Sequence, residues 1–306
     1  MPGMASGRPR GSKAICPAAA AMQVCGAIAG LLKQAKHRKL QNRSRGGLRE
    51  ATQMTGHIIV TDEEQTRTIA MRRPEKKNAL TQEMLLAISE AINSAQSSPE
   101  IRCLILTGRA GVFSVGVDIR DFLDAAKAEP DPATPRGPII FLQALVNNRK
   151  PLIAAVDGAA VGIGATMVLH CDYVLAGATA SFSCPFVQFG LVPEGASSLL
   201  LPRMAGHQRA FAMLVMGRSM SAEAARQAGF VNVVVPTGHA LNEARKAARE
   251  ICALPPEAVA SARRLLKLPN EDLLRRIGQE EHVFAERMRS ADAVAAFENF
   301  LSRKKR

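Results

Sequence analysis

Residues 150–177, KPLIAAVDGAAVGIGATMVLHCDYVLAG, contain two short apolar runs on either side of a glycine-rich segment. The first run, residues 151–156, is bounded by a proline and by an Asp-Gly pair, which predicts a buried strand that ends in a tight turn. The second run, residues 173–176, predicts another strand. Gly162 and Gly164 mark the expected start of a helix between them, where the missing side chains let the backbone approach another group closely. Strand, helix and strand in this order indicate an α/β core.

The first amides of this expected helix have a chemical use as well. They lack intrahelical acceptors and carry the positive end of the helix dipole, so they suit a ligand that develops negative charge. Short glycine motifs are weak signals, and a close-packed helix start in an α/β core is the commoner meaning of the same residues.

Composition limits the classes of protein to consider. The chain has 306 residues, 47% hydrophobic and 22% charged, which is typical of a globular protein with one large core or two modest domains. The absence of Trp and the single Tyr disfavour a protein that stacks bases of single-stranded nucleic acid. No apolar run reaches the length of about 20 residues that spans a membrane. Six widely spaced cysteines indicate neither a zinc site nor a disulfide scaffold, and they favour a reducing compartment.

The net charge of +13 is concentrated at the N-terminus, where residues 1–53 contain ten basic residues and one acidic residue. We therefore predict a basic, largely disordered extension that is separate from the fold. A transit peptide, a basic tail and sequence upstream of the true start all fit this composition. The protein is expected in the cytoplasm, or in an organelle if the extension is a transit peptide. Nucleic-acid binding by the remainder is disfavoured.

From residue 54 onward the periodicity predicts a core of alternating strands and helices over residues 54–237 and a helical module over residues 238–306. Thr81, Asp118 and Ser221 are expected to cap helices. The expected strands are 57–61, 66–71, 101–107, 151–156, 173–176, 180–184 and 231–235, and the expected helices are 82–95, 119–128, 139–146, 195–205, 208–216, 222–228, 240–254, 256–266 and 271–301.

Four motifs together point to a known family: RRPEKKNAL at 72–80, FSVGVDI at 113–119, KPLIAAVDGAAVGIG at 150–164 and CDYVLAG at 171–177. With these motifs the chain resembles, from residue 54 to about residue 301, the crotonase superfamily, the enoyl-CoA hydratases and isomerases. The resemblance implies an α/β fold, a spiral of ββα units with a C-terminal helical trimerisation module, and a homotrimer or a dimer of trimers. It implies an acyl-CoA substrate, no further cofactor and no metal. Apolar residues offered for the trimer interface are Leu273, Leu274, Ile277, Val283, Phe284, Val294, Ala295 and Phe297.

The same resemblance assigns two backbone donors to the thioester oxygen, the amides of Val117 and Ile163. Removing a proton next to a thioester makes an enolate, and two fixed donors stabilise that oxyanion. Ile163 departs from the more common glycine. The amide survives that change as long as the side chain points away.

The resemblance also implies residues that bind the substrate. Carbonyl groups around Ala79 would meet the pantetheine, while Lys76, Lys77 and Arg120 are candidates for the CoA phosphates. For any one of these lysines, a solvated surface charge is a more common explanation than a specific contact with the substrate. Further candidates along the substrate are Val115, Asp118, Gly162, Thr166 and Phe186, of which Asp118 has a sufficient local role as a helix cap.

The acid–base residue separates the subfamilies. In the hydratases two glutamates hold a water molecule, and the matching positions here are Thr166 and Phe186, which cannot act as bases. The segment PFVQFGLVPEGASS at 185–198 resembles the peroxisomal-type delta-3, delta-2-enoyl-CoA isomerases, in which one glutamate, here Glu194, is the base. One base suffices to move a proton from carbon 2 to carbon 4.

Three other interpretations stay open at this point. Glu194 would also be favoured by the dipole of a following helix without any catalytic role. A second alternative is another crotonase activity, such as that of a hydratase or a thioesterase, on a related acyl-CoA. A noncatalytic protein that binds RNA or a membrane surface through its basic extension is the alternative from a different class.

Overall fold

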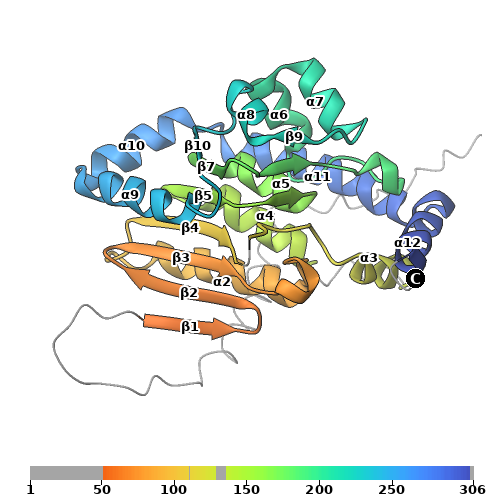
Figure 1. Cartoon of the computed structure of the whole chain (residues 1–306), viewed down its shortest axis with the longest axis horizontal. Coiled ribbons are helices and arrows are strands. Elements are labelled where there is room, and N and C mark those ends of the chain that lie inside the picture. The colour runs from red at the N-terminus through yellow and green to blue at the C-terminus, as the bar shows by residue number, and fades with distance from the viewer. Residues whose placement is uncertain (1–50, 110, 129–135, 304–306) are drawn as a thin grey trace, which may run out of the picture. The chain divides into compact units, whose positions relative to one another are not determined.

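The computed structural model describes residues 51–109, 111–128 and 136–303 (Figure 1). The predicted basic extension lies outside these ranges, except that residues 51–53 begin the first strand. That strand, β1 (Ala51–Thr55), pairs antiparallel with the next one. The described elements belong to one compact unit, and the predicted division at residues 237 and 238 stays a prediction.

A seven-stranded sheet forms the centre of this unit, in the order β1-β2-β3-β4-β5-β7-β10. The first three strands are antiparallel, and every later pair is parallel. The further strands of this sheet are β2 (Ile58–Glu63), β3 (Thr66–Met71), β4 (Cys103–Gly108), β5 (Leu152–Val156), β7 (Tyr173–Gly177) and β10 (Val233–Val235). A smaller sheet has the order β6-β8-β9, with β6 (Ala159–Val161), β8 (Ser181–Ser183) and β9 (Met220–Ser221).

Helices cover both faces of the main sheet. Three predicted caps are confirmed, since the side chains of Thr81, Asp118 and Ser221 accept the amides of Met84, Arg120 and Ala224. The helices are α2 (Gln82–Gln96), α3 (Ile119–Lys127), α4 (Gly137–Asn147), α5 (Ile163–Thr166), α6 (Ser197–Ala205), α7 (His207–Leu214), α8 (Ala222–Gln227), α9 (Ala240–Ala253), α10 (Pro256–Leu266), α11 (Asn270–Met288) and α12 (Ala291–Arg303), with short 3-10 turns η1 (Pro74–Lys76), η2 (Met167–His170) and η3 (Val187–Phe189).

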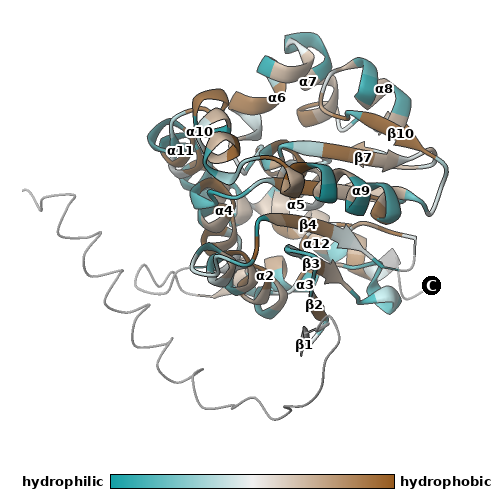
Figure 2. Ribbon diagram, turned by 90° about the vertical axis from the view of Figure 1, so that its left-hand side faces the viewer, coloured by the Kyte–Doolittle hydropathy of each residue, from teal (hydrophilic) through white to brown (hydrophobic). Residues whose placement is uncertain are grey.

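The buried strands are apolar on both faces, as a parallel sheet between helix layers requires. On β4, Leu104 and Leu106 pack into the large cluster that includes α2 and α4, whereas Cys103 and Ile105 point to the other face and meet α9. Helix α9 presents alanines to the sheet, which lets it lie close to the strands. Figure 2 shows the brown strands β4 and β7, and helices that are brown on one side and teal on the other.

The prediction of one helix over residues 271–301 is wrong. Helix α11 ends at Met288 and α12 begins at Ala291, because Ser290 starts a new helix: its hydroxyl accepts the amide of Ala293 and its carbonyl accepts the amide of Val294. Helix α12 then packs against α3, as Figure 1 shows, and the rings of Phe122 and Phe297 stack 5.8 Å apart.

The helix expected after the central glycines is present but short. Helix α5 makes one turn and continues as the 3-10 turn η2. The strands β1, β6 and β9 were not predicted. Strands of two or three residues such as β6 and β9 are too short to show a period-2 pattern.

Four of the residues offered for a trimer interface are buried in the chain's own core. Leu273, Ile277, Phe284 and Phe297 are each at most 5% exposed in the single chain. They stabilise the packing of α11 and α12 and are not available to a partner. Val283, by contrast, is 41% exposed.

Candidate active site

An apolar pocket opens between α3, the start of α4, α11 and the loops around residues 116, 162 and 186; we call it the inner pocket. Val117, Gly162, Ile163, Phe186 and Glu194 all lie on its wall. The sequence separates these residues widely, and the fold brings them together. Other apolar side chains of the wall are Phe122, Ile139, Leu142, Phe189 and Phe284.

Two glycines allow the loops that carry Val117 and Ile163 to touch. A Cβ at Gly116, whose φ is +89°, would lie 2.8 Å from the carbonyl oxygen of Val161, and a Cβ at Gly164 would lie 2.6 Å from that of Ser114. Two backbone hydrogen bonds stabilise the contact: the Ser114 amide donates to the Ala159 carbonyl (3.0 Å), and the Val161 amide donates to the Ser114 carbonyl (2.9 Å). Any side chain at these glycines would force the loops apart.

The two residues whose backbone amides are the candidate donors, Val117 and Ile163, both line the inner pocket. Ile163 is the first residue of α5, so its amide has no intrahelical acceptor. On either side of Val117 the backbone pairs with Leu80: the Leu80 amide donates to the Gly116 carbonyl, and the Asp118 amide donates to the Leu80 carbonyl. Within the described ranges, neither amide donates a hydrogen bond to a protein acceptor.

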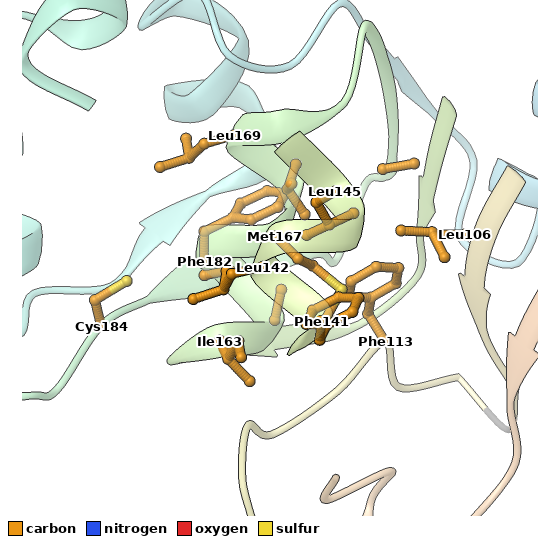
Figure 3. Packing of buried hydrophobic residues seen from close by; sticks show 14 of the residues in the cluster. Leu106, Phe113, Phe141, Leu142, Leu145, Ile163, Met167, Leu169, Phe182 and Cys184 are labelled. Carbon is orange, nitrogen blue, oxygen red and sulfur yellow. The ribbon is translucent and has the colours of Figure 1, made fainter. Parts of the chain in front are cut away.

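The Ile163 side chain is accommodated by the core. It is 4% exposed and belongs to the main hydrophobic cluster. Figure 3 shows it at the edge of the group that includes Phe141, Leu142 and Met167. The isoleucine therefore anchors the helix start while its amide remains free.

Glu194 is a partly buried carboxylate on the wall of the inner pocket. The pKa of Glu194 is raised to about 8, chiefly by burial. The hydrogen bond from the Thr166 hydroxyl lowers this pKa, and the negative charge of Glu280 raises it. The Thr166 Oγ1 donates to the Glu194 Oε1 at 2.6 Å. Thr166 itself is completely buried behind Glu194 and is not part of the pocket wall. A carboxyl group with a pKa near the working pH is suited to general acid–base catalysis.

Side chains from three elements hold the turn that contains Glu194. Besides Thr166, the Nε2 of His170 donates to the Gly195 carbonyl at 2.8 Å, and Glu280 of α11 accepts the amide of Ala196 at 2.6 Å. Burial lowers the pKa of His170 to about 4, so this imidazole stays neutral and has a structural role at the turn.

A second, more polar depression continues from the inner pocket; we call it the outer groove. It is lined by Lys76, Ala79, Asp118 and Arg120, and it shares Val115 and other wall residues with the inner pocket. Lys77 does not line it. This lysine ends the 3-10 turn η1 with a left-handed φ of +51°.

Asp118 and Ala79 are tied together by one arginine. The Arg73 guanidinium donates to the Asp118 carboxylate (2.9 Å) and to the Ala79 carbonyl (3.0 Å). Burial raises the pKa of Asp118, but the bonds from the Arg120 amide and from Arg73 outweigh it, and the net shift is downward. Asp118 therefore stays ionised and fixes the loop, as predicted for a helix cap.

Comparisons with known proteins identify the family. The sequence matches the enoyl-CoA hydratase/isomerase family over residues 61–306. The chain belongs to this family. Solved structures confirm the crotonase fold: OdaA of Pseudomonas aeruginosa is 40% identical with a TM-score of 0.76, and the alignment covers 80% of this chain and 99% of that one.

Relatives within the family have different activities. Human enoyl-CoA delta isomerase 2 is 32% identical over 251 residues, which cover 81% of this chain but 64% of the human protein. The 2,3-dehydroadipyl-CoA hydratase of Escherichia coli K12 is 29% identical, covering 81% of this chain and 96% of that one. The protein is therefore a crotonase-type acyl-CoA enzyme, and the identities leave its specific reaction to be argued from the site.

Sequence reasoning missed several charged residues near the pocket of this family member. Asp121 and the ion pair of Arg136 with Glu281 line the inner pocket, and Glu280 lies behind it. A signal for Glu280 existed, because it occupies the apolar stripe of α11. The buried residues of that stripe are Leu273, Ile277, Glu280, Phe284 and Met288.

Two other features bear on the range of functions. Among the described residues, no group of three or more His, Cys, Asp or Glu side chains is arranged to hold a metal ion. Over the same ranges, no helix combines the length and the apolar character that crossing a membrane requires.

Proposed function

We propose that this enzyme is a delta-3 to delta-2 enoyl-CoA isomerase in which Glu194 is the base. The observation that supports this most is the position of Glu194, a carboxylate with a raised pKa on the same pocket wall as the Val117 and Ile163 amides. The two positions that carry glutamate in the hydratases hold Thr166 and Phe186 instead.

In the proposed reaction, the thioester oxygen accepts hydrogen bonds from the Val117 and Ile163 amides. The Glu194 carboxylate takes a proton from carbon 2, and the electrons of that C–H bond move into a dienolate whose negative charge lies on the thioester oxygen. The protonated Glu194 then returns the proton to carbon 4. The double bond moves from carbons 3 and 4 to carbons 2 and 3, and no water is consumed.

The remaining surfaces provide for the rest of the substrate. The apolar wall of the inner pocket suits the acyl chain, and the outer groove suits the CoA moiety. Lys76 and Arg120 on this groove are the proposed partners of the CoA phosphates, and the backbone near Ala79 is the proposed contact of the pantetheine. No cofactor besides the CoA carried by the substrate enters this reaction.

Hydration of 2-enoyl-CoA is the second candidate. Asp121 and Glu281 also line the inner pocket, so carboxylates other than Glu194 are present to orient a water molecule. Arg136 already engages Glu281, which favours isomerisation over hydration.

The test is the variant Glu194→Gln, assayed with 3-enoyl-CoA and with 2-enoyl-CoA. We expect isomerase turnover to fall by about 10²-fold or more, because a general base is lost, while acyl-CoA binding stays nearly unchanged. Phe186→Leu is the control, with a far smaller effect expected. Undiminished turnover of folded Glu194→Gln would refute the proposal, and wild-type hydration faster than isomerisation would favour the second candidate.

We further propose a homotrimer or a dimer of trimers as the working form. This rests on family membership, since the apolar residues of α11 are mostly used within the chain. Sedimentation at micromolar concentration should show a species of three or six chains. A monomer under these conditions would contradict the proposal.

A further inference from the structure

Helix α6 begins three residues after Glu194, at Ser197, and the partners of its first amides are unusual. The Ala196 and Ser198 amides donate to the carboxylate of Glu280, at 2.6 and 3.0 Å, and the Ser198 hydroxyl donates to it as well. The Ser197 amide donates to the backbone carbonyl of Glu194, and the Leu199 amide donates to that of Ala196. Every one of these amides is therefore satisfied without the Glu194 carboxylate.

The start of a helix attracts the nearest carboxylate, because its free amides and its dipole both favour negative charge. Along the chain, the nearest carboxylate is that of Glu194. In the structure the place is taken by Glu280, which comes from the buried stripe of α11 and is 7% exposed. The Glu194 side chain instead lies on the inner pocket with a single hydrogen bond from Thr166.

We propose that Glu280 is a positioning residue for Glu194: by occupying the start of α6, it keeps the Glu194 carboxylate off the helix and in the inner pocket. This inference rests on the proposed function of Glu194 as the base. It also accounts for a carboxylate inside an apolar helix stripe, where burial of a charge is costly unless it is hydrogen-bonded.

The charge of Glu280 has a second effect on the base. Its negative charge opposes ionisation of Glu194, and by neutralising the positive end of α6 it removes a feature that would favour ionisation. Replacing Glu280 by a neutral residue changes both contributions in the same direction. The pH at which Glu194 ionises must then fall.

Other titratable or charged groups face these two carboxylates. Near Glu194 they are Cys184 after β8, His170 on η2, Asp121 on α3, Arg136 before α4 and Glu281 on α11, and Arg276 faces Glu280. His170 is neutral because burial lowers its pKa, and Arg136 is paired with Glu281. Burial keeps Cys184 in its thiol form. Within the described ranges, Glu280 is the carboxylate whose charge raises the pKa of Glu194.

The test compares Glu280→Gln with the wild type in the pH dependence of kcat/KM for a 3-enoyl-CoA, between about pH 5 and 10. The wild-type activity should rise with pH through a midpoint near the Glu194 pKa of about 8. In Glu280→Gln the midpoint should move to lower pH by about half a unit or more. At alkaline pH, where Glu194 is ionised in both proteins, kcat should fall by about tenfold with KM nearly unchanged, because the base is misplaced.

Two further variants separate charge from geometry. Glu280→Asp keeps the charge but shortens the side chain, so the midpoint should stay while kcat falls. Glu286→Gln removes an exposed carboxylate from the same helix and should leave both the midpoint and kcat as in the wild type.

A wild-type midpoint and a wild-type kcat in folded Glu280→Gln would overturn the inference. If that variant does not fold, Ser198→Ala replaces it. Ser198→Ala removes one hydrogen-bond donor and so destabilises the ionised form of Glu280. The midpoint of the pH–activity profile should then move to lower pH by a smaller amount than in Glu280→Gln. An unchanged profile would refute the inference. Loss of activity in Glu194→Gln combined with an unshifted Glu280→Gln profile rejects this inference alone, whereas full activity in Glu194→Gln rejects the proposed function itself.

Discussion

Replacing the proposed base should make the protein more stable at alkaline pH. A folded-state pKa raised from 4.5 to about 8 means that the folded protein holds the Glu194 proton over a range in which the unfolded chain has released it. The free energy of unfolding therefore decreases as the pH rises from about 4.5 to about 8. Glutamine resembles the protonated carboxyl and can still accept the Thr166 hydrogen bond, so Glu194→Gln avoids this loss.

The size of the effect follows from the shift. A rise of about 3.5 pKa units, at 1.36 kcal/mol per unit, sets an upper limit of about 5 kcal/mol. Glu194 lies on an open pocket wall and is partly exposed, so screening by water reduces the expected gain to about 1–3 kcal/mol. In a folded unit of this size each kcal/mol changes the melting temperature by about 2–4 °C.

The assay is thermal unfolding of the wild type and Glu194→Gln at a series of pH values. The melting temperatures should nearly coincide at about pH 4.5 and diverge in favour of the variant up to about pH 8 and above. A carboxylate that merely stabilised the start of α6 predicts the opposite sign, a loss of about 1 kcal/mol in the variant at neutral pH. A variant that melts below the wild type at pH 8 would therefore refute the assignment of Glu194 as a partly buried acid with a raised pKa.

Two other predictions concern the neighbours of this carboxylate. Gly164→Ala should lower stability by about 2 kcal/mol and turnover at least tenfold, because its Cβ would lie 2.6 Å from the Ser114 carbonyl oxygen. The control is Gly278→Ala in α11, where the added Cβ would meet no atom of another element within 4 Å, and which should stabilise the protein by about 0.5–1 kcal/mol. Thermal unfolding measures the stability of both variants, and steady-state kinetics measure their turnover. Thr166→Ala removes the hydrogen bond that lowers the Glu194 pKa, so the midpoint of the pH–activity profile should move to higher pH while turnover at alkaline pH stays far above that of Glu194→Gln. A midpoint that moves to lower pH would contradict the hydrogen-bond assignment.

Local sequence signals predicted much of the fold. Thr81 and Asp118 cap their helices as expected because capping depends on a side chain and an amide two or three residues away. The strand at 66–71 and the helix at 256–266 match the structure residue for residue, since each carries its own pattern of apolar residues or a proline at its start.

The features that sequence reasoning missed depend on contacts between distant residues. Strand β6 has three residues and pairs with β8, a later segment of the chain, and Ser114 from another loop also bonds to it. Glu280 binds the amide of Ala196 from a helix much farther along the chain, and the pattern around residue 196 contains no hint of it. Placing Val117 and Ile163 on one pocket wall was predictable from the family resemblance, while the charged pair of Arg136 and Glu281 beside them was not.

The order in which the chain is synthesised matters for the outer groove. One wall comes from Lys76, Ala79 and the segment up to Asp124, and the facing side chains include Phe300 and Leu301 of α12. During translation the first wall leaves the ribosome long before the second, so Phe122 stays without its stacking partner Phe297 until α12 has been made. A nascent chain that stops short of α12 therefore exposes an apolar strip along α3, which is the kind of surface that chaperones bind and that drives aggregation.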